Sequence, residues 1–254
     1  MRFVVAVKQV PDTTLIRVDE HGSLIRQGIP AILDPYAEHA LEAVLGLKKP
    51  GDTVTVVTMG PPQAEAVLRR CLEIGADEAY LLADAAFAGA DVHATAKTLS
   101  VFVKRVVPDA TLIICGKQAA DGDTGEVPAE LAQMLGISQF CYVTQLKRNG
   151  DGFLVTQDYG DEQRDCRVPA GSVLSVAEGD LNRRLPSIKR YLEATALPIT
   201  VLNRVQLMLG AYSVGLKGSR TKIVESHAVR TVRTGKIFDG TDPVKAAAHL
   251  KEML

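Results

Sequence analysis

Short apolar segments alternate with amphipathic ones along the first 136 residues, and this alternation constrains the fold more than any other feature of the sequence. The apolar segments are continuous and rich in β-branched residues, as expected of strands that are buried on both faces of a sheet. Strands that alternate with helices predict an α/β fold with a doubly wound, mainly parallel, Rossmann-like sheet. The predicted strands are residues 3–7, 54–59, 79–82 and 111–115, and the predicted helical stripes are residues 37–45, 64–72, 92–103 and 127–135.

Residues with capping preferences mark the ends of the predicted helices. Asp34 precedes Pro35, and this pair suits the N-cap and the first position of the first helix. Gly75 suits the C-terminal cap of the second helix, and Asp91 suits the N-cap of the third. Pro128 lacks a backbone N–H, so it must lie in the first turn of the fourth helix.

The pattern changes to short alternating segments between residues 139 and 177. This change predicts added, partly antiparallel strands on one edge of the sheet. A hairpin is expected around residues 19–23, and Asp242-Pro243 predicts the start of a last helix.

Charge is distributed unevenly along the chain. The net charge is −1, but residues 1–180 contain 16 Lys and Arg against 25 Asp and Glu, whereas residues 181–254 contain 13 against 5. Periodicity is also too weak in residues 195–240 to predict a core of their own. We therefore predict a nucleotide-binding α/β domain over residues 1–194, and an extended C-terminal arm over residues 195–254 that packs on a partner subunit or a phosphate-bearing ligand. A solvated tail is the alternative.

The composition argues against several classes of protein. Near-zero net charge disfavours a nucleic-acid binder, and a chain with 12 aromatic residues and no Trp is a poor platform for stacking single strands. Neither an apolar run of 18 residues nor a signal-peptide pattern occurs, so no membrane span and a cytoplasmic location are expected. Four isolated cysteines and five scattered histidines predict buried reduced thiols and no metal site.

Ligands of open parallel sheets bind beyond the carboxyl ends of the strands, near helix N-termini. The last predicted strand of this kind is followed by a loop with glycines, a hydroxyl and free backbone amides, which suits a phosphate. An ordinary turn from strand to helix is the alternative. In this loop Asp121 and Asp123 could hold Mg²⁺ or a ribose hydroxyl, or remain solvated. The segments expected at this edge are residues 8–11, 34–36, 59–62 and 116–125.

Common catalytic and nucleotide-binding motifs are absent. There is no GxGxxG after Val7, no GxxxxGK[ST], no Gly-x-Ser-x-Gly and no convincing Cys/His nucleophile pair. The residues alone therefore predict an α/β nucleotide-binding module without hydrolytic machinery, and no catalytic residue is assigned.

Several separated motifs resemble those of electron-transfer flavoprotein β subunits, in the same order and along nearly the whole chain. The family pairs its β subunit with an α subunit that contributes most of the domain holding one FAD. The resemblance therefore implies that the basic C-terminal arm wraps onto that FAD domain. The motifs are Val5–Asp12 (VAVKQVPD), Asp34–Ala43 (DPYAEHALEA), Gly75–Glu78 (GADE), Gly116–Thr124 (GKQAADGDT) and Leu181–Lys189 (LNRRLPSIK).

The same resemblance implies that the body binds a second nucleotide at the strand ends. Leu185, an apolar residue in a basic segment, becomes the candidate anchor for a partner dehydrogenase, with ordinary packing as the alternative. The contact residues carried over by position are Ala6, Asp34, Pro35, Tyr36, Met59, Ala119, Asp121, Gly122, Asp123, Thr124, Gly125 and Val127.

Two subgroups of the family differ in this second nucleotide. Some members hold AMP, whereas electron-bifurcating members hold a second FAD and bind NADH. Residues 121–124 and 214–221 resemble the bifurcating type, although Arg220 stands where many relatives have proline and residues 157–160 depart from the usual Arg-x-x-Glu-x-Gly pattern. The resemblance implies electron transfer from NADH to a flavin dehydrogenase and to ferredoxin or flavodoxin. A single-flavin carrier with structural AMP, and an adenine-nucleotide-sensing module without a redox role, are the alternatives.

Overall fold

The structure is a computed structural model that describes residues 1–12, 17–18, 24–25, 30–179, 183–222, 224 and 242–253. Contacts between residues divide the chain into two units, which are described separately. The main unit comprises Met1–Ile16 and Arg26–Val224, and the second unit comprises Arg17–Ile25 and Glu225–Leu254.

A nine-stranded sheet forms the centre of the main unit, in the order β11-β10-β9-β12-β8-β1-β6-β7-β13. The strands from β9 to β13 in this order are parallel to one another, whereas β10 is antiparallel to both β9 and β11. The predicted α/β class with a mainly parallel sheet is therefore confirmed. The strands are β1 (Arg2–Ala6), β6 (Thr53–Met59), β7 (Glu78–Leu82), β8 (Leu112–Gly116), β9 (Gln139–Asn149), β10 (Gly152–Asp158), β11 (Gln163–Val168), β12 (Ser172–Val176) and β13 (Ile199–Leu202).

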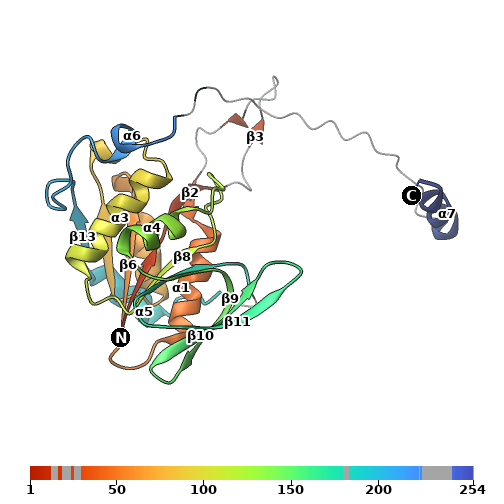
Figure 1. The fold of residues 1–254 in the computed structure, drawn as a ribbon, viewed down its shortest axis with the longest axis horizontal. Helices are drawn as coiled ribbons and strands as arrows, with labels where there is room; N and C mark the ends of the chain where they lie inside the picture. The colour runs from red at the N-terminus through yellow and green to blue at the C-terminus, as the bar shows by residue number, and fades with distance from the viewer. Residues whose placement is uncertain are drawn as a thin grey trace. The chain divides into compact units, whose positions relative to one another are not determined.

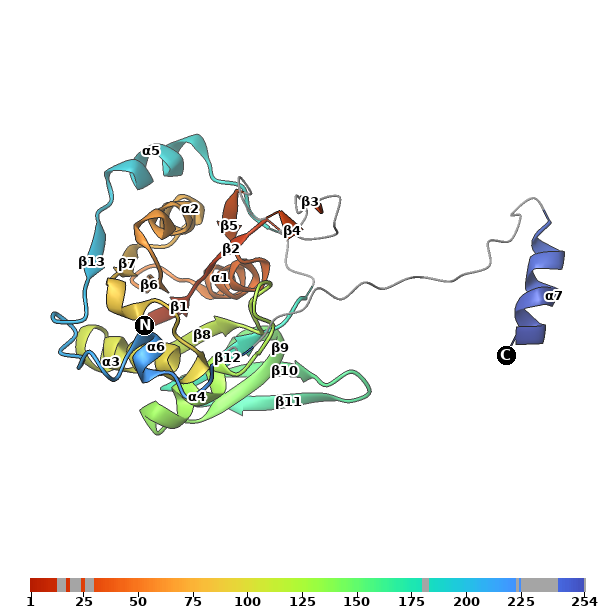
Figure 2. The ribbon, with the colours of Figure 1, turned by 90° about the horizontal axis from the view of Figure 1, so that it is seen from above.

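Helices cover both faces of this sheet (Figures 1 and 2). α1, α2 and α5 lie on one face and α3 and α4 on the other, and each face has its own hydrophobic cluster. Val5 and Leu41 belong to the first cluster, and Val4 and Phe102 belong to the second. Because alternate residues of β1 enter opposite cores, the strand is apolar from Phe3 to Ala6. The helices are α1 (Pro35–Leu47), α2 (Glu65–Ile74), α3 (Val92–Val106), α4 (Val127–Leu135) and α5 (Ile188–Ala196).

The predicted capping residues lie at the helix ends. Asp34 caps α1 and Asp91 caps α3 through their side chains, while Gly75 follows the last residue of α2. Pro128 lies in the first turn of α4, where its missing N–H costs nothing. The shorter elements of the main unit are β2 (Gln9–Pro11), which pairs with β5 (Ala31–Leu33), the 3₁₀ helices η2 (Pro62–Ala64) and η3 (Ala85–Phe87), and α6 (Gly215–Gly218).

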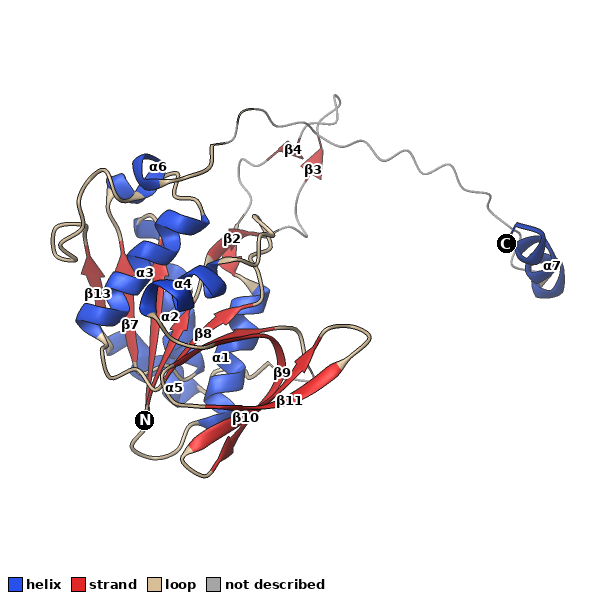
Figure 3. Ribbon diagram, viewed as in Figure 1, coloured by secondary structure: helices blue, strands red, loops and turns tan. Residues whose placement is uncertain are grey.

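The strands predicted between residues 139 and 177 extend one edge of the sheet (Figure 3). β9 is parallel to β12, and β10 and β11 continue the edge as an antiparallel ribbon. The register between β9 and β12 shifts between Leu174 and Val176, so β9 bulges at Cys141 and Tyr142. A bulge of this kind bends a strand and redirects its side chains.

The body of the protein extends beyond the boundary that we predicted at residue 194. β13 pairs with β7 in the sheet, and Leu207, Leu209 and Val214 are buried in the second hydrophobic cluster. The expectation that this stretch lacks a core contact within its own chain is wrong for residues 199–222. Its apolar residues are spaced too irregularly to show a period, yet they pack beside α3 and the end of β7.

Two aspartates after β7 hold this added segment. Asp84 accepts a hydrogen bond from the Arg204 N–H at 3.1 Å. Asp91 Oδ2 accepts hydrogen bonds from the Arg220 N–H at 2.7 Å, the Thr221 N–H at 2.9 Å and the Thr221 hydroxyl at 3.0 Å. Burial opposes ionisation of Asp91, but these hydrogen bonds and the α3 cap outweigh it and lower its pKa to about 2.

The second unit contains the predicted hairpin and the predicted last helix. β3 (Arg17–Val18) pairs antiparallel with β4 (Leu24–Ile25), and α7 spans Pro243–Met253. Asp242 Oδ1 accepts a hydrogen bond from the Lys245 N–H at 3.1 Å, as a helix cap does. Among the described residues of either unit, no helix has the length and apolar character needed to cross a membrane.

Candidate functional site

The carboxyl end of β1 lies at the point where the strand order reverses. From β1 the chain proceeds to β6 and β7 on one side, and then crosses to β8 on the other side. Open α/β sheets bind ligands in the crevice at such a switch point. Ala6 ends β1, Met59 ends β6 and Gly116 ends β8, so the structure brings these predicted positions to one edge.

Asp34 joins α1 to the loop that follows β8. Its Oδ1 accepts hydrogen bonds from the backbone N–H groups of Tyr36 at 3.0 Å and Ala37 at 3.1 Å, which caps the helix. Its Oδ2 accepts a third hydrogen bond from the Ala120 N–H at 2.8 Å. The residue is 1% exposed, so this carboxylate is a buried connection between two segments 86 residues apart. The sequence predicted the cap but not the connection.

The backbone of α1 approaches the end of β8 closely at Gly116. A Cβ at this position would lie 2.7 Å from the Tyr36 carbonyl carbon and 2.8 Å from the Ala37 nitrogen. Only glycine allows this approach, because real Cβ atoms do not come so near to a backbone. The next residue, Lys117, donates its N–H to the Val176 carbonyl at 2.7 Å, so β12 supports the start of the loop.

The acidic residues of the loop have side-chain partners. Lys8 Nζ lies 2.5 Å from Asp121 Oδ1, and the Gln118 amide donates a hydrogen bond to Asp123. The Ala119 carbonyl accepts the N–H of Asp123 at 2.8 Å, which closes the turn. Both residues are nonetheless exposed to solvent, so these pairings do not exclude the solvated alternative. In the part of the chain that the structure describes, no group of three or more His, Cys, Asp or Glu side chains is arranged to hold a metal ion.

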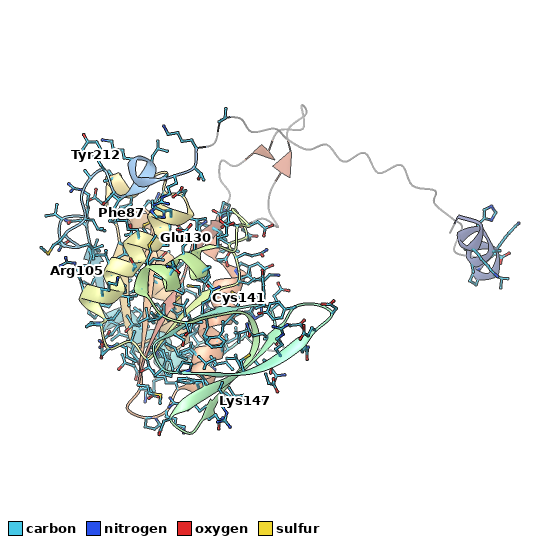
Figure 4. The ribbon with its side chains drawn as sticks, viewed as in Figure 1. Phe87, Arg105, Glu130, Cys141, Lys147 and Tyr212 are labelled. Atoms are coloured by element: carbon cyan, nitrogen blue, oxygen red, sulfur yellow. The ribbon has the colours of Figure 1, made fainter. Side chains whose placement is uncertain are left out.

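α4 begins directly after this loop, and its N-cap residue, Glu126, makes no capping hydrogen bond through its side chain. Thr124 and Gly125 are exposed just before it, and Gly125 has a φ of +67°. The positive end of a helix and the free N–H groups of its first turn bind phosphate. Glu130 Oε2 lies 3.0 Å from His93 Nδ1, which links α4 to α3 (Figure 4). The residues present at this edge therefore fit a phosphate-bearing nucleotide.

The Tyr36 phenol lies beside the loop that follows β8. Gln118 Nε2 donates a hydrogen bond to the Tyr36 hydroxyl at 3.4 Å. Burial raises the pKa of Tyr36, and the carboxylates of Glu178, Asp123 and Asp34 raise it further. The phenol therefore stays neutral at physiological pH, and it can both donate and accept a hydrogen bond.

Four side chains that we did not predict form a ladder beside the loop; we call Lys117, Tyr142, Tyr159 and Arg164 the tyrosine ladder. Lys117 Nζ lies 5.5 Å from the centre of the Tyr142 ring, and Tyr142 meets Tyr159 edge-to-face at 5.6 Å. Arg164 lies 5.6 Å from the Tyr159 ring. Tyr142 has a φ of +55°, which is rare for a bulky residue and is often found where side chains meet ligands. Tyr159 lies within residues 157–160, and the departure of these residues from the family pattern is the signal in the sequence that could have indicated it.

Leu185 lies on a different segment, which contacts the middle of α1 through Arg184. Its side chain is 85% exposed, so ordinary packing within the described part of the chain does not explain it. Arg184 next to it is bound to Glu42 of α1.

The cysteines are reduced, as predicted, but only two are fully buried. Burial raises the pKa of the Cys115 thiol to about 12, and burial also raises the pKa of Cys71. Cys141 and Cys166 are partly buried. Cys141 lies on β9 (Figure 4). A raised pKa disfavours the reactive thiolate, so Cys71 and Cys115 act as packing residues.

The fold and this edge define an open α/β protein of the doubly wound class, with a loop and two helix N-termini at the switch point. Residues 22–179 match the model of the electron transfer flavoprotein domain. The chain belongs to the family of electron transfer flavoprotein β subunits, whose members pair with an α subunit and carry electrons.

Three relatives illustrate the match. The electron transfer flavoprotein subunit beta of Thermoanaerobacterium thermosaccharolyticum is 42% identical over 246 residues, which cover 94% of this chain and 93% of the relative. Subunit CarD of the caffeyl-CoA reductase-Etf complex of Acetobacterium woodii is 38% identical, over 100% of this chain and 98% of the relative. The acryloyl-CoA reductase electron transfer subunit gamma of Anaerotignum propionicum is 34% identical, over 96% and 95%.

Proposed function

We propose that this chain is the β subunit of an electron-bifurcating heterodimer and holds FAD at the carboxyl edge of its sheet. It receives electrons from NADH and passes them to a flavin dehydrogenase and to a low-potential acceptor, ferredoxin or flavodoxin. A bound flavin supplies the hydride acceptance and one-electron release that this role requires. The residues of this chain bind the nucleotide and orient it.

The observation that carries this proposal is the connection made by Asp34. One buried carboxylate fixes the N-terminus of α1 and the loop after β8 against each other, at the switch point of the sheet. The N-terminus of α4 follows that loop and receives the phosphates, while Ala6 and Met59 lie at the ends of the two strands below it. In this proposal the Tyr36 hydroxyl and the loop backbone bind the sugar.

The tyrosine ladder supports FAD rather than AMP in this site. Tyr142 and Tyr159 are 40% and 45% exposed, and Lys117 connects them to the start of the loop. AMP ends at its phosphate, whereas FAD continues with a planar ring system that can stack on aromatic side chains. An exposed aromatic pair beside a phosphate loop offers a stacking surface to this additional ring system.

We expect the purified heterodimer with its α subunit to release two FAD and no AMP when it is denatured, and NADH to reduce it. Nucleotide extraction with a flavin count for each heterodimer, followed by an NADH titration, measures both. One FAD with one AMP would contradict bifurcation and support the single-flavin carrier. A stable colourless homodimer without the α subunit would instead support the adenine-nucleotide-sensing module.

Replacing Tyr142 with leucine is expected to weaken FAD binding at this site by up to about tenfold, because a stacking contact contributes roughly 0.5–1.5 kcal/mol. Tyr142→Phe is the matched control, because it keeps the ring and experiences the same backbone φ of +55°. Dialysis of the heterodimer followed by a flavin count measures the loss. If the two variants retained FAD equally, the tyrosine ladder would not contribute to binding of the cofactor.

The partner surfaces complete the proposal. Leu185 anchors the dehydrogenase. The C-terminal arm, predicted over residues 195–254, packs on the FAD domain of the α subunit through the part that follows the main unit, and residues 225–241 of that part lie outside the described residues. Two relatives support a reductase partner, because their names place them with a caffeyl-CoA reductase and with an acryloyl-CoA reductase. The uneven charge supports the arm, because a basic C-terminal segment of this kind is typical of a contact with a partner.

A further inference from the structure

We infer that Glu38 and Glu42 of α1 are positioning residues that hold residues 183–187 in a fixed conformation for the dehydrogenase. We call the two glutamates and their partners, Arg183 and Arg184, the carboxylate latch. The inference rests on the proposed role of Leu185, and it adds the residues that set where Leu185 is displayed.

Glu42 is a charged side chain that is 3% exposed. Glutamate is rarely buried to this extent unless its charge is paired. Its Oε1 accepts a hydrogen bond from the Arg184 backbone N–H at 2.8 Å, and its Oε2 accepts one from Arg184 Nε at 2.6 Å. Because one of the two bonds goes to the main chain, Glu42 fixes the path of the backbone directly before Leu185.

Glu38 repeats the contact one helical turn earlier. Residues four apart lie on one face of a helix, so both carboxylates face the same segment. Glu38 Oε2 lies 3.3 Å from Arg183 Nε, and the Glu38 side chain is 15% exposed. Two consecutive arginines therefore meet two glutamates one turn apart, which sets the register of the segment on α1.

A reciprocal pair of arginines fixes α5, which follows the latch. Arg190 of α5 donates from Nε to the Leu72 carbonyl of α2 at 2.9 Å. Arg69 of α2 donates to the Leu197 carbonyl, just beyond α5, at 2.8 Å. Cations at the carboxyl ends of helices are favourable, and here each helix supplies the cation for the other.

The segment is thus held by polar contacts and displays its apolar side chains outward. Leu185 is 85% exposed, Ile188 is 82% exposed and Leu192 is 61% exposed, whereas Ala194 is the residue of α5 that is buried. In an ordinary surface helix, the apolar side chains face the core and the polar side chains face the solvent. The latch and the arginine pair replace the packing that these apolar residues would otherwise provide.

A buried ion pair adds little net stability to a fold. The role of the latch is therefore to specify one position for residues 183–187. A docking segment that is ordered in advance loses less conformational entropy when the partner binds. The latch should therefore change the KM for the dehydrogenase and leave the kcat and the bound nucleotide unchanged.

The test uses the heterodimer with its α subunit and measures electron transfer to the purified dehydrogenase. For Glu42→Gln we expect the KM for the dehydrogenase to rise about tenfold, with kcat and flavin content within about twofold of the parent protein. We also expect trypsin to cleave faster after Arg183 and Arg184, because the released segment reaches the protease more often. Glu38→Gln provides a second variant at a less buried carboxylate, and its smaller effects should have the same direction.

The matched control is Glu73→Gln on α2, where the carboxylate lies 3.6 Å from Arg70 and has no described contact with the latch. Leu185→Ala tests the anchor itself. A raised KM in Leu185→Ala with unchanged kinetics in both latch variants would overturn the latch alone. An unchanged KM in Leu185→Ala would overturn the anchor and the latch together. Loss of flavin in Glu42→Gln would show a structural role and would also overturn the inference.

Discussion

Replacing Asp34 with alanine is expected to lower the free energy of unfolding by about 2.5–4 kcal/mol and the nucleotide content of the heterodimer by about tenfold. Loss of a helix N-cap costs about 1 kcal/mol, and loss of a hydrogen bond to a buried charged group costs about 1.5–3 kcal/mol. Both losses occur together, because the same carboxylate accepts the N–H groups of Tyr36 and Ala37 and that of Ala120. Thermal unfolding and nucleotide extraction measure the two effects.

Asp34→Asn separates the two roles of this side chain. The asparagine oxygen can still cap α1, but its amide cannot accept the Ala120 N–H. We therefore expect the asparagine variant to keep most of the stability and to lose nucleotide, because the loop after β8 is no longer tied to α1. Full nucleotide content in Asp34→Asn, together with full content in Asp34→Ala, would place the ligand elsewhere on the protein.

Most of the fold was predictable because its signals are local. The strands buried between two helical layers are continuous apolar runs, and Val4 and Val5 show why, since they enter opposite cores. Asp34, Asp91 and Gly75 mark helix ends through contacts within a few residues of themselves. Contacts between residues so close in the chain can be predicted from the sequence alone.

The segment from 199 to 222 shows where local information ends. Leu207 and Val214 are buried, but neither belongs to a periodic pattern, because the chain there is mostly loop between β13 and α6. Its position depends on Asp84 and Asp91, which lie more than 100 residues earlier. We therefore placed the start of the arm at residue 195, although the main unit continues to Val224.

The candidate site was predicted in its parts but not in its connections. The strand ends and the loop 116–125 follow from the parallel sheet, because all carboxyl ends meet at one edge. The bond between Asp34 and Ala120 joins residues that share no local pattern. The tyrosine ladder depends on the pairing of β9 with β10 and on the bulge at Tyr142, neither of which a single sequence reveals.

Replacing Gly116 with alanine is expected to be the most damaging small substitution at the site. The new Cβ would lie 2.7 Å from the Tyr36 carbonyl carbon, so the first turn of α1 must move away from β8. Overpacking of this kind costs about 1–3 kcal/mol, and here the displaced backbone carries Tyr36 and the cap made by Asp34. We therefore expect the free energy of unfolding and the FAD content to fall together.

Gly46→Ala on α1 is the matched control, because Gly46 is not a predicted nucleotide contact and a Cβ at Gly46 meets no described atom within 4 Å. Because alanine suits a helix better than glycine does, the control should not lower the free energy of unfolding, and its FAD content should stay unchanged. Denaturant unfolding and a flavin count on both variants complete the test. If Gly116→Ala kept its FAD and its stability, the N-terminus of α1 and the end of β8 would not form one site, and the nucleotide would have to bind without Asp34.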